Sequence, residues 1–226
     1  MDIIKFDIYR NPNIGVFFQA NDSFLFSPPG VASTKISKIT KHLKVENIST
    51  TIGGSRLVGA LSVMNSNGII VSKLIEGFEE DVIKEETGLS LQKLDSRFTS
   101  AGNLIAANDY GAIVSSLVGE DEAKNISKIL KVPVKRMNIA SMYLMGAMIK
   151  STNTGAVAHP IINDNIAPDL NRKDFCRGNG YILSKGKFDG RLNFTFSASR
   201  NTVHIQFNDI IGRKTLFLII SNTSFP

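Results

Sequence analysis

The heptapeptide Gly-Ala-Leu-Ser-Val-Met-Asn at residues 59–65 decides the fold of this chain, because variants of it recur along the sequence. Each variant begins with glycine and ends, six places on, with Asn or Thr; the others occupy residues 15–21, 102–108 and 146–152. These anchor glycines (Gly15, Gly59, Gly102 and Gly146) are 44, 43 and 44 residues apart, and a further step of 44 reaches Gly190. Spacing this regular predicts tandem structural units, with a fifth unit near the end of the chain.

Each unit shows the same order of expected elements. An apolar run leads from the anchor glycine to a polar turn, and a second apolar run follows at residues 69–71, 112–114 and 156–158. The turns end in Gly68, Gly111 and Gly155, which are expected to supply the positive φ values that hairpins need. Amphipathic helices are expected at residues 33–43, 76–86 and 120–130. A short strand should follow each helix, at residues 45–48, 91–94 and 134–137.

A unit of this size buries too little apolar surface to be stable alone, so neighbouring units must pack on one another. Five units can close into a ring, as propellers do, and closure removes the open sheet edges. We therefore expect an α/β ring in a single domain, residues 1–226, with repeats at about 1–44, 45–88, 89–132, 133–175 and 176–226. The anchor glycines are expected where backbones approach closely near the ring axis.

Composition restricts the class of protein. The longest apolar stretches, such as residues 216–220, are far shorter than the roughly 20 residues of a membrane span. The N-terminus alternates apolar and charged residues, which indicates a strand and not a signal peptide. The single cysteine, Cys176, can form neither an internal disulfide nor a Cys-rich zinc cluster. These features predict a cytoplasmic protein with no membrane segment.

The net charge of +6 is concentrated in the C-terminal part of the chain. Residues 1–170 contain 17 Lys+Arg and 17 Asp+Glu, so residues 171–226 supply the whole excess. Two interpretations remain open for this basic tail. It can steer the protein towards RNA, or it can be a solvated surface with no binding role.

Cys176 is the candidate nucleophile of the chain, and it lies in a stretch flanked by Lys and Arg that could lower its pKa. Its base would have to be His159 or His204, because the third histidine, His42, is expected to be solvated on a lysine-rich helix face. No carboxylate stands at a spacing that would complete such a set. The Gly53–Gly54 pair lacks the lysine of a phosphate-binding loop. The sequence thus predicts no catalytic residue, no metal site and no cofactor.

Four groups of residues resemble one known family. They are Asn13–Ile14–Gly15–Val16, Ile52–Gly53–Gly54–Ser55–Arg56–Leu57–Val58–Gly59, Ala101–Gly102–Asn103 with Asn108–Asp109–Tyr110, and Gly155–Ala156–Val157–Ala158–His159–Pro160. In this order and register they resemble the translation initiation factor six family, the ribosome anti-association factors of archaea and eukaryotes. The resemblance covers about residues 1–162 and is closer to the archaeal members.

The resemblance implies the pentein fold, a five-fold pseudosymmetric α/β propeller, and a non-catalytic role. Members of the family bind the joining face of the large ribosomal subunit beside the sarcin–ricin loop. There they block premature joining of the small subunit, and they take part in late large-subunit maturation. The implied protein is a monomer without a cofactor. The matching positions expected to contact the ribosome are Gly15, Arg56, Gly102, Asn103, Asn108, Asp109 and Tyr110.

The fifth repeat departs from the family pattern, because residues 171–226 keep Gly190 but none of the family's other motifs. Either this repeat has diverged or the reading frame has shifted. Two other functions also remain open. One is a pentein-type hydrolase or transferase acting on guanidino groups through Cys176, and the other is general RNA binding by the basic tail.

Overall fold

The computed structural model describes residues 6–139 and 141–153 with their side chains. It also describes the backbone of four later strands: β11 (Ala156–Ala158), β12 (Ile182–Phe188), β13 (Leu192–Ser199) and β14 (Thr202–Asp209). The described residues form a mixed α/β structure made of small separate sheets. None of the helices in this part combines the length and apolar character that a membrane span needs.

Three consecutive units repeat one arrangement of elements. The first has α1 (Ile14–Phe17), β1 (Gln19–Ala20), β2 (Phe24–Ser27), α2 (Ser33–Leu43) and β3 (Glu46–Ser49). The second has α3 (Val58–Leu61), β4 (Ser62–Met64), β5 (Gly68–Val71), α4 (Gly77–Thr87) and β6 (Ser90–Lys93). The third has α5 (Ala101–Leu104), β7 (Ile105–Ala107), β8 (Ala112–Val114), α6 (Glu120–Leu130) and β9 (Val134–Arg136). A fourth unit begins with α7 (Met145–Met148) and β10 (Ile149–Ser151) and continues into β11.

Each of the first three units contains one three-stranded sheet. Its first two strands are antiparallel, and its third strand runs parallel to the second. A parallel pair cannot be joined by a tight turn, so the long helix of each unit provides the crossover between them. The predicted helices are confirmed at 33–43 and 120–130, and the third begins at Gly77 because Glu76 is its N-cap in a capping box with Glu79.

The sequence pattern did not reveal the four short helices. We expected a strand to begin at each anchor glycine. Each anchor glycine instead lies inside a four-residue helix. A single helical turn is too short to leave a 3.6-residue periodicity in the sequence. The strand expected directly after each glycine therefore begins three or four residues later, as at Ser62 and Ile105.

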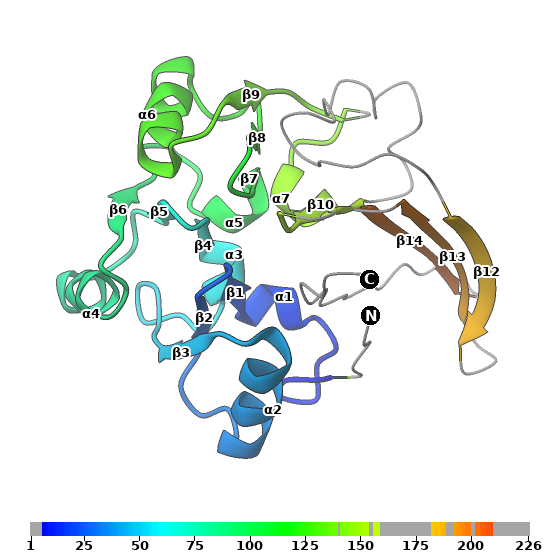
Figure 1. Ribbon diagram of the computed structural model, residues 1–226. Coiled ribbons are helices and arrows are strands. Elements are labelled where there is room, and N and C mark those ends of the chain that lie inside the picture. Colours follow the sequence, from blue (N-terminus) through cyan, green and yellow to red (C-terminus); the bar gives the residue numbers. More distant parts are fainter. Residues whose placement is uncertain are drawn as a thin grey trace.

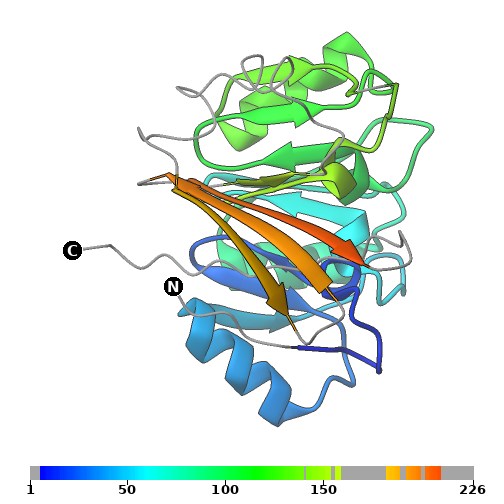
Figure 2. The same ribbon diagram turned by 90° about the vertical axis from the view of Figure 1, so that its right-hand side faces the viewer.

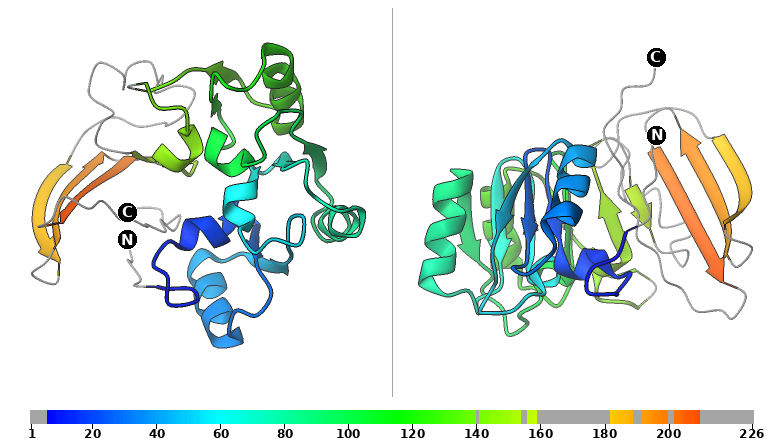
Figure 3. Two further views of the ribbon diagram at one scale, coloured as in Figure 1. Left: turned by 180° about the vertical axis from the view of Figure 1, so that it is seen from behind. Right: turned by 90° about the horizontal axis from the view of Figure 1, so that it is seen from below.

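The short helices gather in the middle of the molecule, and the long helices lie on its rim (Figure 1). In chain order, α1 packs on α3, α3 on α5, and α5 on α7. The view from behind shows the same order of units, with α2, α4 and α6 on the outside (Figure 3). This arrangement follows from tandem units that each pack on the next.

Three hydrophobic clusters of the described residues span two units, and a fourth, around Ile14 and Leu25, lies within the first unit. Val63 and Ile70 of the second unit are buried together with Leu104 and Ile126 of the third. Phe26 of the first unit packs in the same way into a cluster of second-unit residues, and Ala106 and Ile113 of the third unit pack with Met145 and Ile149 of the fourth. Neighbouring units therefore share hydrophobic clusters, as in a repeat protein.

The last described sheet differs from the three-stranded sheets of the first three units. Strands β12, β13 and β14 form an antiparallel meander, without the parallel third strand of the earlier units. Strand β14 lies near β11, and the curved sheet faces the viewer in Figure 2. Gly190, the expected anchor of the fifth repeat, lies outside the described residues.

Candidate functional site

The anchor glycines allow the short helices to touch. A Cβ atom on Gly59 would lie 2.3 Å from the carbonyl oxygen of Gly15. One on Gly102 would lie 2.1 Å from the oxygen of Gly59, and one on Gly146 would lie 2.1 Å from that of Gly102. Any side chain would separate neighbouring helices. The expected close approach of backbones is confirmed, and Gly15 and Gly102 are part of it.

The polar turn of each unit is shaped by asparagine and not by glycine. The Asn65 Oδ1 atom accepts hydrogen bonds from the N–H groups of Asn67 (2.9 Å) and Gly68 (3.0 Å). Asn21 and Asn108 do the same in their own turns. The expectation of positive φ at Gly68 and Gly111 was wrong, because the side-chain oxygen closes the turn without a left-handed residue. At Gly68 the reason for glycine is instead that a Cβ atom would meet the Ile129 carbonyl oxygen at 2.3 Å.

The same asparagines connect one unit to the next. The Nδ2 atom of Asn21 donates to the Asn65 carbonyl oxygen (2.9 Å), and that of Asn65 donates to Asn108 (3.1 Å). Asn108 then donates to the carbonyl oxygen of Thr152 (3.1 Å). The Asn108 side chain is only 4% exposed. Its described contacts hold the third unit to the fourth.

Asp109 belongs to a polar cluster between four turns. Its carboxylate accepts hydrogen bonds from the Ser66 N–H and hydroxyl groups, both at 2.7 Å, and from Asn153 Nδ2 at 2.6 Å. Asn153 also donates to the carboxylate of Asp22 (2.7 Å). The first and fourth units, 131 residues apart, therefore meet at this point. We call the end of the molecule formed by these turns the turn face; Tyr110 lies there and is 37% exposed.

The opposite ends of the strands form a second surface, which we call the loop face. It consists of the segments that lead into α1, α3 and α7, at residues 8–13, 51–57, 139 and 141–144. In the second unit, Met64 pairs with Ile69 beside the turn, whereas Ser62 pairs with Val71 beside α3, so the two faces lie at opposite ends of the sheet. Its exposed residues include Tyr9, Arg10, Arg56, Leu57, Met142, Tyr143 and Leu144.

Each of these three segments contains a two-residue turn. Reciprocal backbone hydrogen bonds close the turns between Ile8 and Asn11, Ile52 and Ser55, and Ile139 and Met142. Gly53 and Gly54 have φ values of 61° and 69°, as a type I′ turn requires. The sequence was considered only for a phosphate-binding loop at this pair, whereas in the structure both glycines form the turn.

The first of these turns is strained. Tyr9 (φ 52°) and Arg10 (φ 60°) occupy the left-handed region without being glycine. The Tyr9 ring is held in place by its hydroxyl group, which donates to the Pro29 carbonyl oxygen (2.8 Å), and by an edge contact with Phe17. The Arg56 guanidinium lies 5.6 Å from the centre of the same ring. Non-glycine residues in this conformation are concentrated at functional sites.

The loop face also exposes large apolar side chains. Tyr9, Leu57, Met142, Tyr143 and Leu144 are all between 41% and 47% exposed. Arg10 and Arg56 are exposed among them. A mixture of aromatic, aliphatic and arginine side chains is typical of binding interfaces. The signal in the sequence was a Leu two places before two of the anchor glycines, Leu57 and Leu144, which sequence reasoning did not use.

The structure does not bring all seven sequence-predicted contact residues to one surface. Arg56 is on the loop face, whereas Asn108, Asp109 and Tyr110 are on the turn face. Gly15 and Gly102 lie in the central helices. Asn103 lies on α5 and is half-buried. Their role in binding remains a prediction.

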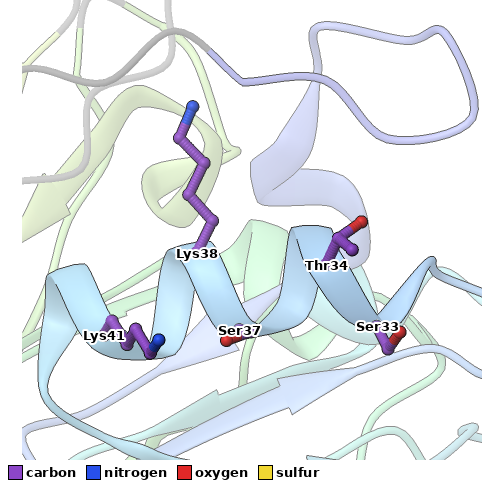
Figure 4. A pocket seen from close by; sticks show the side chains of 5 residues that line it. All are labelled: Ser33, Thr34, Ser37, Lys38 and Lys41. Carbon is purple, nitrogen blue, oxygen red and sulfur yellow. The ribbon is translucent and has the colours of Figure 1, made fainter.

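Other candidate sites carry no chemistry that we can assign. A shallow hollow on α2 is lined by Ser33, Thr34, Ser37, Lys38 and Lys41, all from one helix (Figure 4). Within the described part of the chain, no three His, Cys, Asp or Glu side chains gather as metal ligands would. His42 is half-buried with its Nε2 atom shielded and unpartnered, so the expectation that it is solvated was wrong. Cys176 and His159 lie outside the described residues, as does the side chain of His204.

The fold and its surfaces define an α/β protein of repeated small sheets packed around central short helices. The sequence model of the eIF-6 family matches residues 3–172, and the chain belongs to this family. It is 43% identical over 146 residues to Translation initiation factor 6 of Nitrosopumilus maritimus, which covers 65% of this chain and 66% of that protein. It is 35% identical over 150 residues to the protein of that name from Haloquadratum walsbyi (66% of each chain). The protein of that name from Pyrococcus abyssi is 36% identical over 169 residues (73% of this chain, 74% of that one). The chain thus matches just under two thirds of the length of the first of these relatives.

Proposed function

We propose that this protein is a ribosome anti-association factor. It binds the joining face of the large ribosomal subunit beside the sarcin–ricin loop, prevents premature joining of the small subunit and assists late large-subunit maturation. It acts as a cytoplasmic monomer without a cofactor and without catalysis. Membership of the eIF-6 family and the names of its archaeal relatives support this role.

The observation that carries the proposal is the gathering of exposed apolar side chains and two arginines on the loop face. Arginine suits phosphate recognition, and the aromatic and aliphatic side chains suit a protein surface. A ribosomal site offers both chemistries side by side. We therefore assign subunit binding to the loop face, with Arg56 as the first residue to test. Asn103, on the central helix α5, is the second.

We also propose that the whole chain forms a single pentein domain. Its five repeats would lie at about 1–44, 45–88, 89–132, 133–175 and 176–226, the last one divergent. The contact between Asp22 and Asn153 supports a common axis, because it joins the first unit to the fourth. A rigid ring of this kind acts sterically, by occupying a surface that the small subunit needs.

Sedimentation with purified archaeal large subunits tests the function. Wild-type protein should co-sediment with large subunits and inhibit their joining to small subunits. Arg56→Ala should weaken binding by about 1–2 kcal/mol, roughly five- to thirtyfold, as expected for an interface arginine. Lys124→Ala, on the rim helix α6, removes a comparable exposed charge and should leave binding unchanged. Wild-type protein that neither co-sediments nor inhibits joining would refute the proposal.

The alternatives are less well supported. The comparisons give no support to a guanidino-group hydrolase or transferase using Cys176. Binding of RNA by the basic tail makes a separate prediction: removing residues 171–226 should abolish it, whereas binding through the loop face should respond to Arg56→Ala.

A further inference from the structure

Glu79, in the first turn of α4, is a buried carboxylate that holds the loop carrying Arg56. Its side chain accepts hydrogen bonds from the N–H groups of Gly53 (2.6 Å) and Gly54 (2.9 Å), and from the Thr51 hydroxyl group (2.5 Å). The Glu76 N–H donates to it as well, at 2.9 Å. Glu79 is only 1% exposed. Four donors on one shielded carboxylate make this a strong attachment.

Gly53 also packs closely against the segment that precedes α4. A Cβ atom at Gly53 would lie 2.6 Å from the carbonyl oxygen of Leu74. The turn is closed by the Ile52–Ser55 hydrogen bonds, and Leu57 N–H donates to the Ser55 hydroxyl group (3.2 Å). The backbone on both sides of Arg56 is thus tied, through the turn, to Glu79.

The first and third units use the same helix position to hold a loop. Lys35, the third residue of α2, donates to the backbone carbonyl and carboxylate oxygens of Asp7, just before the Tyr9–Arg10 turn. Glu122, the third residue of α6, accepts the N–H of Asp95 (3.0 Å), at the start of the segment between β6 and α5. Each rim helix therefore holds the loop that leads into the short helix of its own unit.

We propose that Glu79 is a positioning residue that sets Arg56 for binding to the large subunit. Glu79 contacts no partner itself, because it is buried beneath the loop. It acts by ordering the Thr51–Arg56 segment before binding, so that less conformational freedom is lost in the complex. The inference rests on the proposed function, since it concerns the same surface.

A double-mutant cycle tests the role, with affinities measured on purified archaeal large subunits. Glu79→Gln removes the charge and presents an amide donor to groups that are themselves donors. It should weaken binding by about three- to tenfold through loss of preorganisation. In an Arg56→Ala background the same change should have no further effect, because the residue it positions is gone. Glu80→Gln is the matched control: Glu80 is next in the helix but pairs only with Lys84 and Lys93 among its described ion pairs, so affinity should stay at the wild-type value.

Hydrogen exchange in the free protein provides an independent readout. The Gly53 and Gly54 amides should lose protection in Glu79→Gln and keep it in Glu80→Gln. If Glu79→Gln folds poorly, Thr51→Val removes one donor while leaving the capping box intact, and should weaken binding by a smaller factor. Wild-type affinity in Glu79→Gln, or an equal loss in both backgrounds, would overturn the positioning role alone. Wild-type protein that fails to bind would overturn the proposed function and this role with it.

Discussion

The turn face and the loop face lie at the two ends of the same strands, and they differ in how their polar groups are used. On the turn face, Asn21, Asn65 and Asn108 each use Oδ1 within their own turn and Nδ2 towards the next unit. On the loop face, the turn hydrogen bonds stay within each segment, Tyr9, Arg10 and Ser141 have positive φ, and apolar side chains are exposed. One end carries side-chain hydrogen bonds between units, and the other exposes apolar side chains.

The largest expected loss of stability comes from disturbing the packed central short helices, which support both faces. Gly102→Ala places a Cβ atom 2.1 Å from a carbonyl oxygen of the preceding helix, and backbone cannot move aside cheaply. We expect a loss of more than about 3 kcal/mol in the free energy of unfolding, measured by urea denaturation. Gly119→Ala, where a Cβ atom meets nothing within 4 Å, is the control and should be nearly neutral.

Asn108→Ala tests the difference between the faces directly, because it should lower stability without changing binding. It leaves two turn N–H groups and the Thr152 carbonyl oxygen without their buried partner, so unfolding should become easier by about 2–3 kcal/mol. Under conditions in which the Asn108→Ala protein is folded, its binding to large subunits should be unchanged. Loss of binding in a stable Asn108→Ala protein would instead make Asn108 a direct contact, as the family resemblance implies.

Acid should weaken the hold of Glu79 on the loop face. Burial acts to raise the pKa of the Glu79 carboxyl, but hydrogen bonds from Glu76, Thr51, Gly54 and Gly53 outweigh it, and the pKa lies below its usual value. A lowered pKa means that this contribution to stability is complete above the usual value of about 4.3 and is lost as the pH falls through the folded-state pKa.

Glu79→Gln should therefore be less stable than wild type by about 2 kcal/mol at pH 7, with the difference shrinking below about pH 4. Urea denaturation between pH 7 and pH 3 measures it. A difference that stays constant over this range would show that the charge of Glu79 is not what matters.

The smallest effect compares two strained residues on opposite faces. Arg10 and Lys44 both have φ of 60°, and Lys44 ends α2 near the turn face. Replacing either by glycine should raise the free energy of unfolding by about 0.5–1 kcal/mol, because glycine takes this conformation without steric cost. Only Arg10→Gly should also weaken binding to large subunits. Equal affinities of the two variants would remove Arg10 from the binding surface.

The period of 43 to 44 residues and the amphipathic rim helices were predictable because both are local patterns. The helix at 33–43 is marked by Ile36, Ile39 and Leu43 on one face, whatever that face packs against. The short helices were not predictable, since a single turn leaves no periodicity. Glu79 was equally hidden, because in sequence it is one member of an acidic run, whereas in the fold it is the one turned inwards beneath Gly53 and Gly54.

The sequence by itself determined the order of the units, the spacing of their anchor glycines and the helices of the rim, because these depend on residues close together in the chain. Only the tertiary structure decided which end of the strands joins the units and which end is exposed. That division depends on contacts such as Asp22 with Asn153, 131 residues apart, and on asparagine side chains that bind backbone of the next unit. Such partners are chosen by the stacking of whole units, which no local pattern records.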